Sequence, residues 1–429
     1  MVSALPMLLL LAALLLGVPI AFALAASGIF GIWLITGDWN IVFGIMGSTP
    51  FSSTAVYVLT TAPMFVLMAY FTASSGLARD LFTAMANWLS HIRGGLAIAT
   101  VFSCGIFGAM SGASVAAASV MATVAMPEMR RLGYSEELAA GTIGVGSTLV
   151  ILIPPSVAMV VYGVVTGTSI GKLLMAGIVP GILLGILLCL VILAWVNLVP
   201  SHCPATHRIA WRDRVTGLFP IWPCLGVIFV ILTLLYTGIA TPTEVGAIGA
   251  ALAGIVGALM GRLKSEAAFE ALKLTVRTTA MIFMILIGAT IFGYYMTLSG
   301  IPQEIVRLVI EWNPNRWVVI SGIIVGYFVV SMFMDELPLM LITLQLTFPL
   351  ILKLGFDPIW FGVITMIMIA MGLVFPPVGL AGFIVSATAN VSLMKVYKGT
   401  SILTIALVLT TILLMLFPQI VLWLPTTMR

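Results

Sequence analysis

A proline pair occurs twice in apolar surroundings, as Ile151-Leu152-Ile153-Pro154-Pro155-Ser156 and, 222 residues later, as Val374-Phe375-Pro376-Pro377-Val378-Gly379. Chance matches would not hold one register across many helix-breaking residues. Further pairs share this register or one shifted by a residue or two: Pro127 and Pro349, Leu132-Gly133-Tyr134 and Leu354-Gly355-Phe356, Gly177 and Gly399, Tyr70 and Tyr294, Ser75-Gly76 and Ser299-Gly300, Trp88 and Trp312, Pro19 and Pro242. Breaks at equivalent places in two apolar halves predict a secondary transporter whose binding site lies between the halves.

Composition indicates a membrane protein. Of the 429 residues, 62% are hydrophobic and 7% are charged, and the mean hydropathy is +1.23. Soluble domains carry about 25% charged residues, and a membrane helix needs about 20 apolar residues in a row. We therefore predict an all-α polytopic membrane protein. The apolar start, Leu5 to Leu16, lacks preceding basic residues and a clear cleavage site, so we interpret it as the first membrane helix and not as a removed signal peptide.

The cysteine and histidine side chains indicate no further chemistry. The four cysteines show no paired spacing, and we expect packing roles for them. His202, Cys203 and His207 match no common metal-ligand spacing, so we expect no cofactor and no metal other than sodium. The net charge of +4 lies in the loops and bears on orientation, not on a nucleic-acid partner.

Each half is expected to repeat one order of elements, which includes a re-entrant hairpin followed by a helix broken at the proline pair. The hairpins are inferred at 94–126 and 316–352, because each apolar stretch is too short for two crossings of about 20 residues plus a turn. Scaffold helices are expected at 1–77 (2–16, 19–36 and 54–77) and at 218–298 (218–237, 241–261 and 279–298), and amphipathic arms follow them at 78–92 and 299–313. The transport-domain halves are expected at 93–170 and 314–395, with broken helices at 136–168 and 357–390. Closing helices are expected at 171–199 and 396–429, and an inter-repeat loop at 200–217.

Crossing parity predicts an inverted repeat. Each half is expected to cross the membrane five times. Because five is an odd number, the second half starts on the opposite side of the membrane and is inverted relative to the first. An excess of Lys and Arg marks cytoplasmic loops, so we expect the loop 200–217 inside the cell and both chain ends outside. The basic residues that this arrangement gathers on one side are Arg79, Arg93, Arg130, Arg131, Arg208, Arg212, Arg214, Arg262, Lys264, Lys395 and Lys398.

The proline pairs are the first candidate site. Proline removes a backbone donor and frees a carbonyl one turn earlier, and a bilayer tolerates such groups where they line a cavity or meet a ligand. The segments 148–156 and 371–379 are therefore expected to unwind and to offer carbonyls to a hard cation such as sodium. The helix N-termini that follow would face an anionic substrate. An unliganded proline kink is the alternative, and its recurrence in both halves favours a site.

The hairpin tips are the second candidate site. Ser111-Gly112-Ala113-Ser114 offers hydroxyls and carbonyls, although small residues also permit close helix packing. Asp335-Glu336 occupies the matching place, and carboxylates at membrane depth are costly and usually functional. Asp335 is alternatively a helix cap, because Pro338 follows it. A capping role is also expected for Glu244, after Thr241-Pro242-Thr243.

The tips and breaks contain no Arg or Lys, so cations and helix dipoles would have to neutralise an anionic substrate. This predicts co-transport with sodium, while Asp335 or Glu336 leaves a proton open as an alternative. The candidate sodium-binding residues are Ser111, Gly112, Ser114, Gly146, Thr148, Pro154, Asp335, Gly372, Phe375 and Gly379. The candidate substrate-binding residues are Ser111, Ala113, Pro155, Ser156, Glu336, Pro377 and Thr388.

Four motifs together resemble the large membrane subunit of a TRAP (tripartite ATP-independent periplasmic) transporter: Gly108-Ala109-Met110-Ser111-Gly112-Ala113-Ser114, Ile151-Leu152-Ile153-Pro154-Pro155-Ser156, Thr241-Pro242-Thr243-Glu244 and Gly372-Leu373-Val374-Phe375-Pro376-Pro377-Val378-Gly379. The resemblance spans essentially the whole chain. It implies a sodium-driven elevator in a bacterial or archaeal inner membrane that takes up organic acids. It also implies two partners, a small four-helix membrane subunit, expected as a separate chain, and a soluble periplasmic substrate-binding protein.

Two residues depart from the family pattern. Val150 stands where relatives often have Gly, and Phe375 where they often have Thr, so C4-dicarboxylate specificity does not transfer simply. A stand-alone carboxylate symporter with the same hairpin-and-break plan is the alternative within transport. An intramembrane hydrolase would need a second acid that shares a proton with Asp335, and the first half supplies none. A purely structural anchor would give the costly breaks and acids no purpose.

Overall fold

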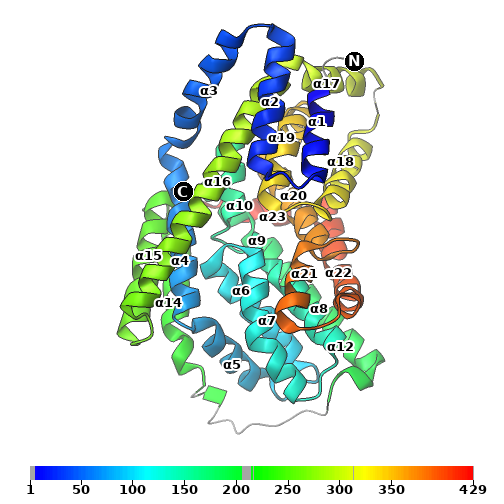
Figure 1. Ribbon diagram of the computed structural model, residues 1–429. Helices are drawn as coiled ribbons and strands as arrows, with labels where there is room; N and C mark the ends of the chain where they lie inside the picture. Colours follow the sequence, from blue (N-terminus) through cyan, green and yellow to red (C-terminus); the bar gives the residue numbers. More distant parts are fainter. Residues whose placement is uncertain (1–4, 205–213, 216, 313, 429) are drawn as a thin grey trace.

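The computed structural model describes residues 5–204, 214–215, 217–312 and 314–428, and α-helices make up most of this part (Figure 1). Eight helical segments in these ranges are long and apolar enough to cross a membrane. The prediction of an all-α polytopic membrane protein is therefore confirmed. Of the predicted loop 200–217, residues 205–213 and 216 lie outside the described ranges, as do Arg208 and Arg212.

One group of helices, here called the panel, takes members from both halves of the chain. It comprises α1 (Leu5–Leu15), α2 (Ile20–Thr36), α3 (Trp39–Thr54), α4 (Thr61–Ser74), α14 (Trp222–Thr237), α15 (Pro242–Leu259) and α16 (Ser265–Ser299). In the panel α2 packs along α16, and α4 packs along α15. A methyl group added at Gly28 would lie 2.8 Å from the Phe292 nitrogen, so glycine allows the first of these close approaches.

The second group, here called the core body, holds the hairpins, the broken helices and the closing helices. Its first half comprises α6 (Gly95–Ser111), α7 (Ser114–Arg131), α8 (Glu136–Ser147), α9 (Leu149–Leu152), α10 (Val157–Thr166), α11 (Ile170–Ala176) and α12 (Ile178–Leu198). Its second half comprises α18 (Arg316–Ser331), α19 (Glu336–Lys353), α20 (Pro358–Val374), α21 (Leu380–Ala389), α22 (Leu393–Leu416) and α23 (Gln419–Thr426). Two amphipathic arms, α5 (Leu77–Leu89) and α17 (Ile301–Trp312), precede the hairpins.

The two halves interlock in both groups. The most extensive helix packings are α2 with α16, α4 with α15 and α8 with α22, and each joins one helix from each half. Within the core body, a methyl group added at Gly141 would lie 2.5 Å from the carbonyl carbon of Gly399. Because the α8 and α22 backbones touch there, the broken helix of one half is fixed against the closing helix of the other.

Equivalent elements of the two halves lie at opposite ends of the molecule, as the arms α5 and α17 show (Figure 1). The ion pairs gather basic residues from both halves at the α5 end. Lys395 Nζ lies 2.9 Å from Glu136 Oε2, Lys398 pairs with Glu137, and Arg262 pairs with Asp80 of α5. The arrangement agrees with the predicted inversion.

Three predicted boundaries are wrong. The third helix does not begin at residue 54, because α3 occupies 39–54 and a 3-10 turn (Tyr57–Thr60) separates it from α4. Asp38 starts α3 by accepting a hydrogen bond from Asn40 N at 2.8 Å, and the helix continues past Pro50. The helix expected at 279–298 begins at Ser265, because its charged first turns remain helical outside the apolar window. Likewise α7 continues past residue 126 to Arg131.

Candidate functional site

The two hairpins meet at their tips. Ser114 Oγ donates a hydrogen bond to Glu336 Oε2 at 3.1 Å, and both side chains are buried. These two residues are equivalents in the 222-residue register. Equivalent residues of an inverted pair touch only close to the pseudo-twofold axis, so the contact lies at the centre of the repeat. Since the hairpins start from opposite ends and meet there, both are re-entrant.

The first tip docks on the first break. Gly112 ends α6 with φ +62°, and its carbonyl accepts a hydrogen bond from Val157 N at 3.4 Å. A methyl group added at Gly112 would lie 2.8 Å from the Pro155 oxygen, so only glycine lets the tip approach so closely. Ala113 is extended and precedes α7. The hydroxyl of Ser111 is buried and has no hydrogen-bond partner, which makes it a candidate ligand for an ion or substrate.

The second tip docks on the second break in a similar way. Gly379, with φ +50°, donates its N–H to the carbonyl of Met332 at 3.0 Å. Asp335 is the N-cap of α19, and its Oδ1 accepts a hydrogen bond from Glu336 N at 2.8 Å. The capping interpretation of Asp335 is therefore confirmed. The acid pair differs in burial, because Glu336 is 7% exposed whereas Asp335 is only half-buried.

Both breaks interrupt their helices at the proline pair, and both Pro-Pro bonds are cis. After the first break Ser156 caps α10 and accepts a hydrogen bond from Met159 N at 3.4 Å. After the second break Tyr397 Oη donates to the carbonyls of Pro377 and Val378, at 3.1 and 2.5 Å. Tyr397 could not be found from the repeat, because its register equivalent is Met175.

Glycine lies on opposite sides of the two hairpin–break contacts. In the first half it lies on the hairpin, where a methyl group added at Gly108 would lie 2.7 Å from Val150 Cγ2. In the second half it lies on the broken helix, where a methyl group at Gly372 would overlap Ser331. Val150, a departure from the family pattern, is therefore accommodated by Gly108.

The remaining candidates occupy different surroundings. Phe375 packs edge-on against Phe328 with ring centroids 5.3 Å apart, so an aromatic contact occupies this place. Thr148 Oγ1 is buried and donates to the Val145 carbonyl at 2.7 Å, and a methyl group at Gly146 would lie 3.2 Å from Cys104 Sγ. Thr388 is exposed near the end of α21, nine residues beyond Gly379, so the structure does not bring it to the tips. Glu244 forms the expected capping box with Thr241.

Paired re-entrant hairpins and paired broken helices in inverted halves define a secondary membrane transporter. The family model described as "Tripartite ATP-independent periplasmic transporter, DctM component" matches residues 7–420. The chain belongs to this family and is a TRAP transporter large membrane subunit.

Relatives with different named cargoes match across most of their lengths. The C4-dicarboxylate TRAP transporter large permease protein DctM of Pseudomonas aeruginosa is 34% identical over 80% of each chain. The ectoine TRAP transporter large permease protein TeaC of Halomonas elongata is 32% identical over 96% of each chain. The sialic acid TRAP transporter large permease protein SiaM of Vibrio cholerae is 27% identical over 86% of each chain. Membership in the family therefore does not name the cargo.

A solved structure shares the fold. The YdaH transporter of Alcanivorax borkumensis superimposes with a TM-score of 0.65 over 90% of this chain and 89% of its own, at 12% identity. At this identity the similarity concerns the fold alone.

Proposed function

We propose that this chain takes up an organic acid across a bacterial inner membrane, coupled to sodium, by an elevator movement of the core body against the panel. A periplasmic binding protein would deliver the acid, and a small membrane subunit would complete the complex. The basic end that includes Arg262 and Lys395 would face the cytoplasm, as the distribution of cations in membrane proteins suggests.

The observation that carries the proposal is the tip-to-tip contact between Ser114 and Glu336, flanked by both breaks. Polar side chains and interrupted backbone converge there at the centre of an apolar protein. Such groups are costly in a bilayer unless they line a cavity or bind a ligand. A site at the interface of inverted halves is also where secondary transporters hold substrate and coupling ions.

Sodium coupling is supported by the chemistry of the two tips. The unpartnered Ser111 hydroxyl, the Ser114 hydroxyl and the Asp335 and Glu336 carboxylates are oxygen ligands of the kind that hard cations prefer. Sodium bound there would balance the charge of an acid substrate, since the described tips and breaks contain no Arg or Lys.

The elevator movement is supported by how each group is held together. In the panel, hydroxyl pairs join the halves: Thr61 to Thr243 and Tyr70 to Thr278, both at 2.8 Å. In the core body, the Gly141 contact with Gly399 joins them. Two internally fixed groups connected by arms suit rigid-body displacement of one against the other.

Uptake into proteoliposomes that contain this chain, the small subunit and the binding protein tests the proposal. Labelled succinate, sialic acid and ectoine would serve as cargo probes. We expect an inward sodium gradient to raise uptake of at least one probe at least about tenfold over an equal potassium gradient, because the coupling ion supplies the driving force. Uptake that follows a proton gradient and ignores sodium would refute sodium coupling.

Two matched variants localise the effect. Glu336→Gln replaces the carboxyl group at the tips by an amide, and Thr388→Ala alters an exposed side chain nine residues beyond Gly379. Sodium-dependent uptake should fall in the first and persist in the second. Equal behaviour of the two variants would remove the tips from the site. Uptake without the binding protein and small subunit would instead favour a stand-alone symporter.

A further inference from the structure

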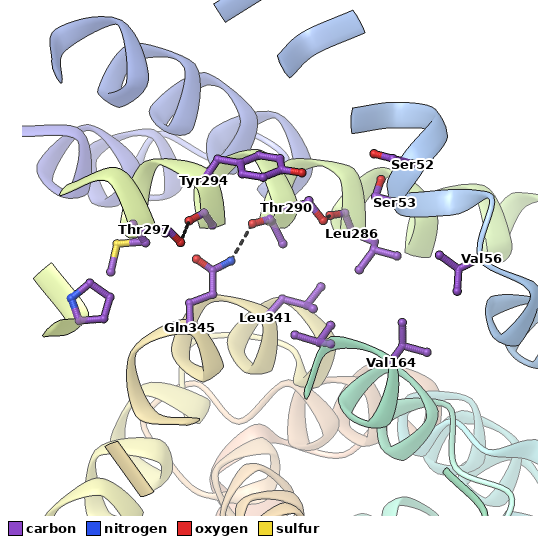
Figure 2. A pocket seen from close by; sticks show the side chains of 15 residues that line it. Ser52, Ser53, Val56, Val164, Leu286, Thr290, Tyr294, Thr297, Leu341 and Gln345 are labelled. Carbon is purple, nitrogen blue, oxygen red and sulfur yellow. Dashed lines mark hydrogen bonds between the residues drawn. The ribbon is translucent and has the colours of Figure 1, made fainter. Parts of the chain in front are cut away.

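A cavity lies between the panel and the core body (Figure 2). Its volume is about 530 Å³, in the range of pockets that hold small organic molecules. We call it the outer chamber. Its polar lining comes from α3, α16 and α19: Ser52, Ser53, Thr290, Tyr294, Thr297 and Gln345.

One lining residue of the outer chamber, Gln345, has a register equivalent that lines a smaller cavity in the other half of the repeat. Gln345 lies nine residues beyond Glu336 in α19, and Thr123 lies nine residues beyond Ser114 in α7. At a rise of 1.5 Å per residue, each is about 14 Å along its helix from the joined tips. Thr123 lines a second cavity of about 360 Å³ beside Arg79 and Glu128, here called the inner chamber. The two cavities share this one register pair and differ in the rest of their lining.

The two chambers differ in charge. The inner chamber has a cation and an anion in its lining, Arg79 and Glu128. All 15 residues that line the outer chamber are uncharged. A cargo in the outer chamber would therefore be recognised by hydrogen bonds and apolar contacts, without an ion pair to the lining.

The hydrogen bonds already present make the outer chamber rich in acceptors. Thr290 and Thr297 donate their hydroxyl protons to carbonyls of their own helix, at 2.8 and 2.9 Å. Ser52 and Ser53 both donate to the carbonyl of Thr49, at 3.4 and 2.7 Å. A hydroxyl that has donated its only proton keeps lone pairs, so these side chains can accept hydrogen bonds from a ligand.

Gln345 completes this pattern. Its Nε2 donates to the Ala289 carbonyl at 2.7 Å, which fixes the amide between α19 and α16 (Figure 2). Its Oε1 is buried and has no hydrogen-bond partner. A buried amide oxygen without a partner costs stability, and a small turn of the Gln345 side chain toward the chamber would let a ligand donate a hydrogen bond to it and remove this cost.

We propose that the outer chamber is a second cargo site, selective for organic acids that also carry hydroxyl or amino donors. Such donors match the acceptor lining, whereas a plain dicarboxylate would bring further acceptors to it. The volume is too large for a dedicated sodium site, because an ion is enclosed by a close shell of oxygen atoms. This inference rests on the proposed function, since it assumes an acid cargo, and it narrows the cargo class.

Protection of an engineered cysteine tests the proposal in membrane vesicles that contain the full chain with its four native cysteines replaced by alanine. Thr290→Cys would be labelled by a membrane-impermeant maleimide added at the face opposite the basic end. Tartrate and succinate are matched probes, because they differ only in two hydroxyl groups. We expect tartrate to protect at about tenfold lower concentration, the effect of two ordinary hydrogen bonds.

Further variants make the result decisive. Gln345→Leu should reduce the tartrate preference to about threefold, because one acceptor is lost. Ser53→Cys provides a second labelling position if Thr290→Cys does not fold, and Thr123→Cys in the inner chamber should not be labelled from that face. Equal protection by both acids, protection by sodium alone or no protection at either position would overturn the proposal. No ion gradient is used, so preference for tartrate without sodium-driven uptake would refute the proposed coupling and leave this inference standing.

Discussion

The two hairpin tips share a backbone arrangement and differ in side chains. In each half an N–H just after the break donates to a carbonyl at the tip, Val157 to Gly112 and Gly379 to Met332. The first tip carries small neutral residues and the second an acid pair. The difference teaches that main-chain docking is what the duplicated halves retain, while binding chemistry diverges between them. Four changes, in order of decreasing expected effect, test this separation.

The hairpin–break contact tests whether the halves accept each other's packing. Gly372→Val gives the second half the residue of the first, Val150, and its side chain would overlap Ser331. We expect a loss of about 3 kcal/mol in the free energy of unfolding, typical of severe overpacking. Denaturant titration in mild detergent measures it. The double variant Ser331→Gly with Gly372→Val moves glycine to the hairpin side of the contact and should recover the part of the loss that overlap with the Ser331 side chain causes, while the backbone of residue 331 still lies 2.8 Å from the added carbon. Full stability of the single variant would contradict the packing argument.

The contact between the tips tests whether the neutral tip depends on the acidic one. Ser114→Ala removes the hydroxyl that donates to Glu336. We expect a loss of about 2 kcal/mol in the free energy of unfolding, because a buried carboxylate loses a hydrogen bond. A double-mutant cycle with Glu336→Gln measures the coupling between them. Additive effects would mean that the two tips act independently.

Within the described residues, a tyrosine hydroxyl donates to backbone carbonyls at the proline pair of the second break but not at that of the first. Tyr397→Phe removes the hydroxyl that donates to Pro377 and Val378 while keeping the ring. We expect a loss of about 1 kcal/mol in the free energy of unfolding, the usual net value of a hydrogen bond. Tyr236→Phe, at an exposed hydroxyl bonded to Thr427, is the matched control and should change little. A larger loss in the control would argue against a special role for Tyr397.

The smallest effect on stability is expected at the first tip. Ser111→Ala deletes a buried hydroxyl that has no partner, so the sodium-free protein should be unchanged or more stable by about 1 kcal/mol. If the hydroxyl binds sodium, the variant should gain less stability than the parent when sodium is added, because ligand binding stabilises the folded state. Thermal unfolding with and without sodium measures both quantities. An unchanged response to sodium would exclude Ser111 as a ligand.

Much of the architecture was predictable from the sequence because helix-breaking residues recur in one register. The proline pairs and tip residues have no other common cause than a repeated backbone, so the hairpins and breaks followed from them. The errors occur where the length of a helix does not match the length of its apolar stretch. The first turns of α16 are charged yet helical, and α3 continues past Pro50.

The site was predictable in its location and less so in its partners. The 222-residue register paired Ser114 with Glu336, but equivalence alone does not imply contact; their positions on the axis do. Tyr397 lies 20 residues from Pro377, outside any local motif, and its role depends on how α22 packs. Gln345 is one polar residue in an apolar helix, and only the position of α16 makes it part of a chamber.

The interlocking of the halves has a consequence for biosynthesis. Helix α8 ends at residue 147, whereas its partner α22 begins at residue 393. The glycine face around Gly141 is therefore inserted well before Gly399 has been made. Contacts of such sequence separation form late and slowly. We expect the helices of the first half to remain loosely associated in the bilayer until α22 has been inserted. Truncated chains that end before α22 should therefore be degraded.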